Sequence, residues 1–97
     1  MNRLVLAARL VERRALRYTP AGLQALDFEL KHESELSEDG QLRKVSLQIR
    51  SVAIGRIVQP LAALELGGAG SFAGFLAAAR NGRGLLFHVT DFEPANI

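Results

Sequence analysis

Two stretches of the sequence alternate between apolar and charged or polar residues, and this period of two constrains the fold more than any other feature of the chain. Residues 26–31 read Leu-Asp-Phe-Glu-Leu-Lys, and residues 44–50 read Lys-Val-Ser-Leu-Gln-Ile-Arg. Successive side chains of a strand point to opposite faces, so each stretch is predicted to be a strand with one face on a core and one in water. Such strands are typical of antiparallel sheets.

Three further segments are predicted to be strands, and turn residues separate the five. Residues 4–11 are apolar enough to be partly covered on both faces, and residues 69–79 and 85–92 supply the last two strands. Turns are predicted at Thr19-Pro20-Ala21-Gly22 and at Asn81-Gly82-Arg83-Gly84, because proline and glycine suit the backbone angles of tight turns. Residues 34–41 are predicted to form a polar, acidic loop that closes on Asp39-Gly40, a hairpin signal.

The connection between the third and fourth strands is the longest in the chain. Ile57, Leu61 and Leu64 have helical spacing there, but Pro60 lacks an amide hydrogen, so a helical turn or an irregular segment is expected. Five short strands with this one long connection are typical of an OB-fold, an all-β, five-stranded Greek-key barrel. An SH3-like barrel is the alternative. The 97 residues are expected to form a single domain over residues 1–97.

Several function classes find no support in the residue content. The chain has no cysteine for a disulfide or a thiolate metal site, and no apolar run of the roughly 18–20 residues that a membrane span needs. Its histidines, His32 and His88, lie on different predicted strands, and His88 is expected to be a hydrogen-bonded structural residue. Asp27 and Glu29 share a solvated strand face. We therefore expect a cytoplasmic protein that is not an enzyme, holds no metal or cofactor and has no membrane partner.

Basic residues are the candidates for function. The net charge is +2, but residues 1–26 and 40–97 are net basic whereas residues 27–39 are net acidic. An OB-fold binds oligonucleotides across its second and third strands, between the first and last hairpin loops. The expected groove combines the following residues: Arg13, Arg14, Arg17 and Tyr18 in the first loop, Lys44, Gln48 and Arg50 on the third strand, and Arg80 and Arg83 in the last hairpin. The alternative is that these charges only keep the surface soluble.

Aromatic side chains suited to base stacking are few. Phe28, Phe72 and Phe87 are expected in the core and Phe92 at the close of the last strand, which leaves Tyr18 and Phe75 as stacking candidates. Single-strand binders gain about 1–3 kcal/mol from each stacked base, so binding is expected to be weak and mainly electrostatic.

Motifs spread over nearly the whole chain resemble bacterial single-stranded-DNA-binding proteins. The resemblance begins with residues 2–6, Asn-Arg-Leu-Val-Leu, and continues through Thr19-Pro20-Ala21-Gly22 and residues 28–32, Phe-Glu-Leu-Lys-His. Residues 52–55 and Leu86-Phe87-His88 extend it. Order, spacing and length are most similar to the short primosomal replication protein N group (PriB) of that family.

The resemblance implies an OB-fold homodimer that binds single-stranded DNA and a PriA-type helicase, with other primosomal proteins as partners in replication restart. By position it adds Arg43 to Lys44 and Arg50 as basic residues of the third strand, beside Arg80 and Arg83 of the last hairpin. Two alternatives from other classes are a protein-interaction adaptor with little nucleic-acid binding and an RNA-binding OB module. The first strand has few charges before Arg9, so its edge is also expected to pair in a dimer.

Overall fold

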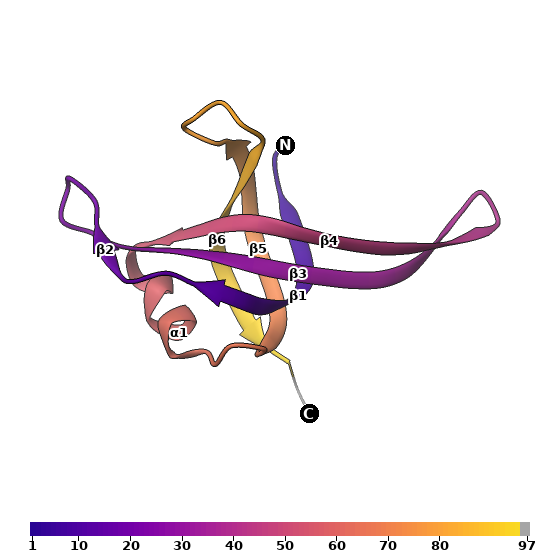
Figure 1. Cartoon of the computed structure of the whole chain (residues 1–97), viewed down its shortest axis with the longest axis horizontal. Coiled ribbons are helices and arrows are strands. Elements are labelled where there is room, and N and C mark those ends of the chain that lie inside the picture. The colour runs from indigo at the N-terminus through magenta and orange to yellow at the C-terminus, as the bar shows by residue number, and fades with distance from the viewer. Residues whose placement is uncertain (96–97) are drawn as a thin grey trace.

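The computed structural model describes residues 1–95, in which the backbone closes into a small barrel (Figure 1). Its elements, in chain order, are β1 (Leu4–Arg13), β2 (Arg17–Tyr18), β3 (Gln24–Glu38), β4 (Gln41–Ile54), a 3₁₀ turn (Gly55–Ile57), α1 (Val58–Ala63), β5 (Ala69–Ala78) and β6 (Leu85–Pro94). The strand order is β1-β5-β6-β4-β3-β2, and β1 also pairs with β3. Five long strands thus close on themselves, with β4 and β6 parallel and the other pairs antiparallel. This confirms the predicted OB-fold; the two-residue β2 is an addition to it.

On β3 the predicted alternation places its apolar side chains in the barrel interior. On β4 it does so only in part, because Ile49 packs against the core whereas Leu47 is 39% exposed. Leu26, Phe28 and Leu30 are at most 3% exposed, and Phe72 and Phe87 are fully buried. Burying each side chain of this kind stabilises a fold by about 1.5–3 kcal/mol. The three phenylalanines expected in the core are therefore confirmed there, and the polar face of β3 and β4 is left outside.

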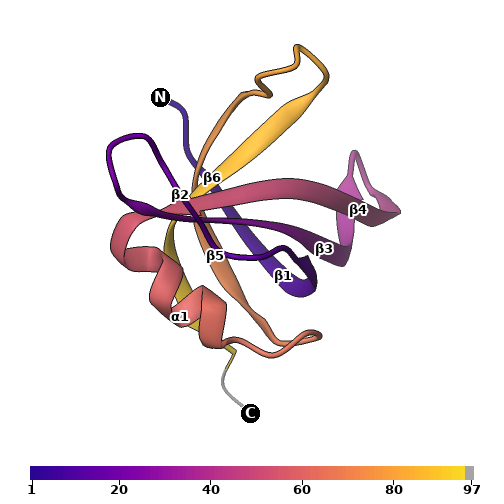
Figure 2. The same cartoon turned by 60° about the vertical axis from the view of Figure 1, so that its left-hand side comes forward.

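A short helix covers one end of the barrel (Figure 2). Val58 and Leu61 of α1 are buried in the core, and Ile57 and Leu64 pack against it. Of the two expected alternatives, a helical turn or an irregular segment, the structure has the helical one, a 3₁₀ turn that leads into the six-residue α1. Pro60 is compatible with this because it is the third residue of α1. Amide groups in the first turn of a helix have no partner inside the helix, so the missing hydrogen costs little there.

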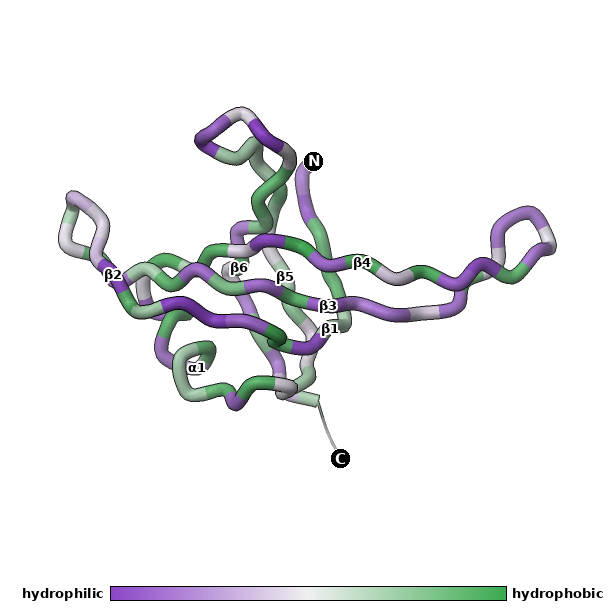
Figure 3. The backbone as a smooth tube through the Cα atoms, viewed as in Figure 1, coloured by the Kyte–Doolittle hydropathy of each residue, from purple (hydrophilic) through white to green (hydrophobic). Residues whose placement is uncertain are grey.

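The acidic loop predicted over residues 34–41 is wrong. β3 and β4 stay paired from Ala25↔Ile54 to Glu38↔Gln41, and only Asp39 and Gly40 form the turn. Both have positive φ, 48° and 79°, as a two-residue type I′ hairpin requires. The outer half of this hairpin, residues 33–46, extends beyond the barrel (Figure 1) and is mostly hydrophilic along β3 (Figure 3). We call it the ribbon. None of its residues belongs to the core cluster, and residues 33–43 lack the alternation that identifies buried strands.

No helix of the described residues is long and apolar enough to cross a membrane.

Candidate nucleic-acid interface

A cleft of about 310 Å³ opens on the outer face of β3 and β4. One wall is the chain around the end of β1 and β2, and the other is the β5–β6 hairpin. Its charged and polar lining residues are Glu12, Arg14, Arg17, Asp27, Glu29, Arg50, Ser51, Arg80 and Asn81. The barrel thus brings together polar groups from three parts of the chain that are far apart in sequence.

Four of the arginines predicted from sequence line this cleft. Arg14 and Arg17 come from the first connection, Arg50 from β4 and Arg80 from the β5–β6 hairpin. A phosphate that enters the cleft meets guanidinium groups on both walls and on the floor. Guanidinium groups present a fork of N–H donors that matches phosphate oxygens.

Arg17 is held by an ion pair on the cleft floor. Its Nε donates to Oδ2 of Asp27 at 2.6 Å, and its Nη2 donates to Oδ1 at 3.1 Å. This two-point contact raises the pKa of Arg17 and holds the side chain in one orientation. The pair also neutralises much of its charge, which lowers the attraction that Arg17 offers to a phosphate.

Arg50 joins the floor of the cleft to the hairpin wall. One of its Nη atoms donates to the main-chain oxygen of Arg83 at 2.8 Å. In the same turn, the amide of Arg83 donates to Oδ1 of Asn81 at 2.9 Å. Gln48, which was also predicted to line the groove, precedes Arg50 by two residues and therefore lies on the same face of β4. Its side-chain amide donates to Oε1 of Glu29 at 3.1 Å.

Two carboxylates face each other in the cleft, and sequence reasoning missed one of them. Glu12 of β1 is the register partner of Glu29 of β3. A side-chain hydrogen bond to Glu29, together with its negative charge, raises the pKa of Glu12 above the ordinary value. The same hydrogen bond, with the one from Gln48, lowers the pKa of Glu29. The acidic pair opposes the arginines and makes the cleft only moderately attractive to polyanions.

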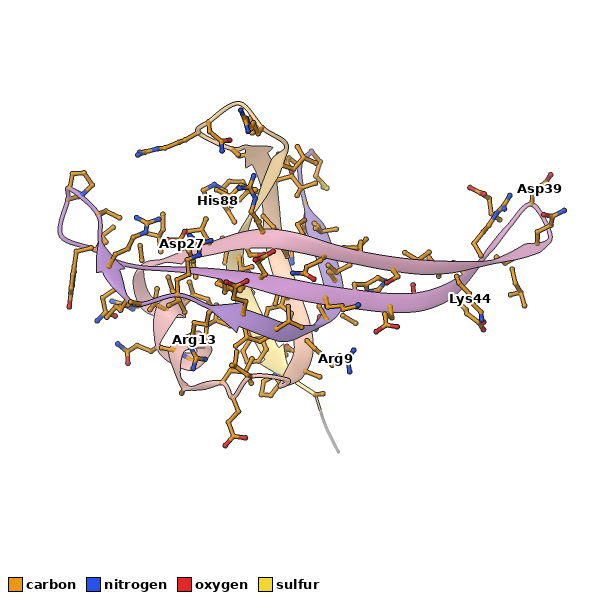
Figure 4. The ribbon with its side chains drawn as sticks, in the orientation of Figure 1. Arg9, Arg13, Asp27, Asp39, Lys44 and His88 are labelled. Atoms are coloured by element: carbon orange, nitrogen blue, oxygen red, sulfur yellow. The ribbon has the colours of Figure 1, made fainter. Side chains whose placement is uncertain are left out.

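Arg13, which was predicted to lie in the groove, is directed away from the cleft (Figure 4). Its Nη1 donates to the main-chain oxygens of Leu61, at 3.3 Å, and of Leu64. These carbonyls belong to the last turn of α1 and the residue after it, where the helix has no N–H donors of its own for its carbonyl oxygens. A cation is also favourable at a helix C-terminus. The contacts make Arg13 a structural residue that fastens α1 to β1.

The remaining predicted residues surround the cleft at greater distance. Arg43 and Lys44 lie on the ribbon, where Arg43 Nε donates to Oε1 of Glu38 at 3.1 Å; Figure 4 shows Lys44 near the ribbon end, far from Asp27. Tyr18 is 63% exposed on β2. Arg83 is exposed at the tip of the β5–β6 hairpin.

His88 was expected to be hydrogen-bonded, but its contact in the structure is aromatic. Its ring stacks on Phe75, with centroids 4.7 Å apart and planes 8° from parallel. His32 instead has the hydrogen bonds, to the main-chain oxygen of Ala7 and to Oγ of Ser34. Over residues 1–95, no three His, Cys, Asp or Glu side chains gather as a metal site would require.

Comparisons with known proteins place this geometry among single-strand binding proteins. A family model described as "Another single-strand binding protein family" matches residues 2–91. The replication restart protein PriB of Bordetella pertussis is 50% identical over 80 residues, which are 82% of this chain and 75% of that protein. The solved structure of PriB from Ralstonia solanacearum has a TM-score of 0.89 and 33% identity, and the match covers 99% of each chain. The single-stranded DNA binding protein of Thermus aquaticus has a TM-score of 0.76 and 27% identity over 99% of this chain and 50% of that one.

Proposed function

The chain belongs to the single-strand binding protein family, within its replication restart group PriB, and on this basis we propose that it binds single-stranded DNA as an accessory protein of the replication-restart primosome. The observation that carries the proposal is the cleft, in which Arg14, Arg17, Arg50 and Arg80 converge across the outer face of β3 and β4. Nothing in this arrangement calls for catalysis, and the role is one of binding.

The expected affinity for DNA is modest. Arg17 is already paired with Asp27, and Glu12 and Glu29 add negative charge to the same surface. If about three or four phosphates are neutralised, the slope of log affinity against log salt is roughly −2 to −3, at about 0.7 per phosphate for single strands. A modest affinity suits an accessory protein that also contacts a PriA-type helicase and other primosomal proteins.

A homodimer is part of the proposal, and β1 supports it. Residues 4–8 of β1 pair with β5, whereas β3 pairs with β1 only from Arg9 onward, so the first half of β1 has one unpaired edge. Val5 within it is 58% exposed. An exposed, uncharged strand edge favours pairing with a second copy. Sedimentation at micromolar concentration is expected to give a dimer, and Val5→Lys, which puts a charge on that edge, is expected to shift it toward monomer.

Titration of labelled oligomers tests the proposed binding directly. Single-stranded DNA and RNA of one sequence are titrated at low and moderate salt. The proposal predicts micromolar binding of DNA with the salt slope given above. A nanomolar interaction that salt does not weaken contradicts the electrostatic mechanism, and a clear preference for RNA favours an RNA-binding module instead.

A second candidate function is a protein-interaction adaptor, and the ribbon favours it. Leu36 and Leu42 near its end are 57% and 76% exposed and are available to contact a partner protein. The double change Leu36→Ser with Leu42→Ser is expected to leave DNA affinity unchanged. If it abolishes stimulation of a PriA-type helicase while a DNA-binding variant does not, the adaptor function is the main one.

A further inference from the structure

We propose that Phe75 and His88 form a stacking platform for a nucleobase of single-stranded DNA, at the side of the cleft opposite β2. The proposal rests on the proposed function and deepens it. The arginines of the cleft have the chemistry to hold phosphates, whereas this pair of rings has the chemistry to hold a base. The affinity for DNA then depends on the bases as well as on the charge of the phosphates.

The pair has the geometry of a platform. Phe75 of β5 and His88 of β6 are direct cross-strand partners, so their side chains stand on the same face of the sheet. The rings are nearly parallel, at 8°, with centroids 4.7 Å apart. Phe75 is 40% exposed, which leaves aromatic surface open to solvent. Because the rings are stacked on one another, a base would stack on the outer face of Phe75, with His88 holding that ring from behind. The imidazole adds an N–H donor at its edge.

The register places this platform on the cleft face of the barrel. Asp27 pairs with Val52, Val52 with His88, and His88 with Phe75, so these four residues form one row across β3, β4, β6 and β5. Directly opposed residues point to the same side of a sheet. Asp27 lines the cleft, and two strand spacings separate it from His88, about 10 Å. Figure 4 shows His88 beside β4, close to Asp27 and below the β5–β6 hairpin. A strand of DNA in the cleft therefore reaches the platform within one or two nucleotides.

The backbone is shaped to bring the two rings together. The β5–β6 register shifts between Ala73 and Gly74, a bulge that re-aims the residues that follow. At Gly74 the two strands approach so closely that a Cβ atom would lie 1.8 Å from the carbonyl oxygen of His88. Only glycine fits there. Phe75 is the next residue, so the close approach sets its ring against that of His88.

The contact between Phe75 and His88 is not part of the hydrophobic core. The other aromatic pair, Phe72 with Phe92, packs in and against the core cluster, with centroids 4.8 Å apart. Phe75 and His88 lie outside that cluster, on the solvent face. Aromatic rings in such a position act as stacking surfaces in proteins that bind single strands.

Abasic DNA gives the sharpest test. Affinity is measured for a normal oligomer and for one of the same length whose sugar–phosphate backbone carries no bases, with wild-type protein and with Phe75→Leu. Leucine keeps the apolar bulk and removes the ring. Stacking contributes about 1–3 kcal/mol per base, so the wild type is expected to bind the normal oligomer roughly 5- to 150-fold more tightly than the abasic one. Phe75→Leu is expected to lose most of that preference and to bind abasic DNA as the wild type does.

Three measurements complete the design. The salt slope of Phe75→Leu is expected to equal that of the wild type, because no phosphate contact is removed. Phe75→Trp is expected to restore the preference for bases. Phe92→Leu is the matched control, since it removes a ring from the core pair and is expected to leave the preference unchanged. Thermal denaturation of each variant confirms that it is folded.

The outcomes separate the two proposals. If the wild type binds both oligomers equally, or if Phe75→Leu keeps the full preference for bases, the platform is refuted and the electrostatic cleft stands. If the wild type binds neither oligomer at low salt, the proposed DNA-binding function itself fails.

Discussion

The guanidinium of Arg50 donates a hydrogen bond of 2.8 Å to the main-chain oxygen of Arg83. One side chain on the cleft floor thereby holds the hairpin that forms the opposite wall. Arg50 is therefore both a cation in the cleft and a positioning residue for the hairpin. Charge and geometry are coupled at this position, so a change at Arg50 acts on both.

Replacing Arg50 with alanine is expected to release the β5–β6 hairpin. Amide hydrogen exchange over residues 79–84 is expected to accelerate, because the contact between Arg50 and the hairpin backbone is lost. Affinity for single-stranded DNA is expected to fall about 5- to 10-fold, since a hydrogen bond from a charged group and a phosphate contact disappear together. Arg56→Ala, an exposed arginine outside the cleft lining, is the control and is expected to change neither quantity. Unchanged exchange in Arg50→Ala would show that the hairpin holds its position alone.

The double change Arg80→Ala with Arg83→Ala is expected to weaken DNA binding without unfolding the protein. Both side chains lie in the exposed hairpin, outside the core. Loss of two phosphate contacts is expected to reduce the magnitude of the salt slope by about 1.4, at about 0.7 per contact. The control is Glu35→Ala with Glu38→Ala on the ribbon, which is expected to leave DNA affinity nearly unchanged. If the arginine variant keeps full affinity but no longer stimulates a helicase, the hairpin is a protein-docking surface.

Alanine in place of Arg13 is expected to lower the stability of the protein, whereas alanine in place of its neighbour Arg14 is expected to weaken DNA binding. Arg13→Ala removes the donor to Leu61 and Leu64 at the end of α1. Its half-buried position suggests a loss of about 1–2 kcal/mol in the free energy of unfolding, and a melting temperature lower by several degrees. Arg14→Ala, in the cleft, is expected to leave the melting temperature unchanged and to weaken DNA binding. The reverse pattern would mean that Arg13 reaches the DNA.

Glu12 is expected to make DNA binding dependent on pH. Its pKa lies above the ordinary value of 4.5, so it gains negative charge as pH rises through the mildly acidic range. Added negative charge in the cleft opposes DNA, and affinity is expected to fall as the pH rises above the ordinary carboxyl pKa of 4.5. Glu12→Gln cannot gain this charge and is expected to bind roughly 2- to 5-fold more tightly at pH 7, a typical size for one exposed charge interaction. Dissociation constants of both proteins across that range provide the measurement. Since both proteins keep His32 and His88, parallel pH curves would exclude a role for Glu12.

Much of the fold was predictable because strands and turns are encoded locally. The alternation in residues 26–31 identified the buried face of β3, and Asp39-Gly40 lies at the turn between β3 and β4. The alternation in residues 44–50 identified a strand but not a buried face, because Leu47 is 39% exposed. The ribbon was not predictable in this way, because a two-stranded hairpin outside the barrel has no buried face to impose alternation. Pro60 left a helical turn and an irregular segment both open for a related reason. Its effect depends on where the helix begins, and the packing of Val58 and Leu61 on the core decides that.

The sequence by itself determined the position of the five long strands, the apolar side of residues 26–31, and that basic residues occupy the first connection, the third long strand and the last hairpin. Only the tertiary structure decided which of them meet. It directed Arg13 to the end of α1, joined Arg50 to the hairpin, set Glu12 against Glu29, and placed Phe75 on His88. The physical reason is that these contacts depend on strand register, a bulge and the closure of the barrel. Each of those arises between segments that are distant in the chain, so no short stretch of the sequence predicts it.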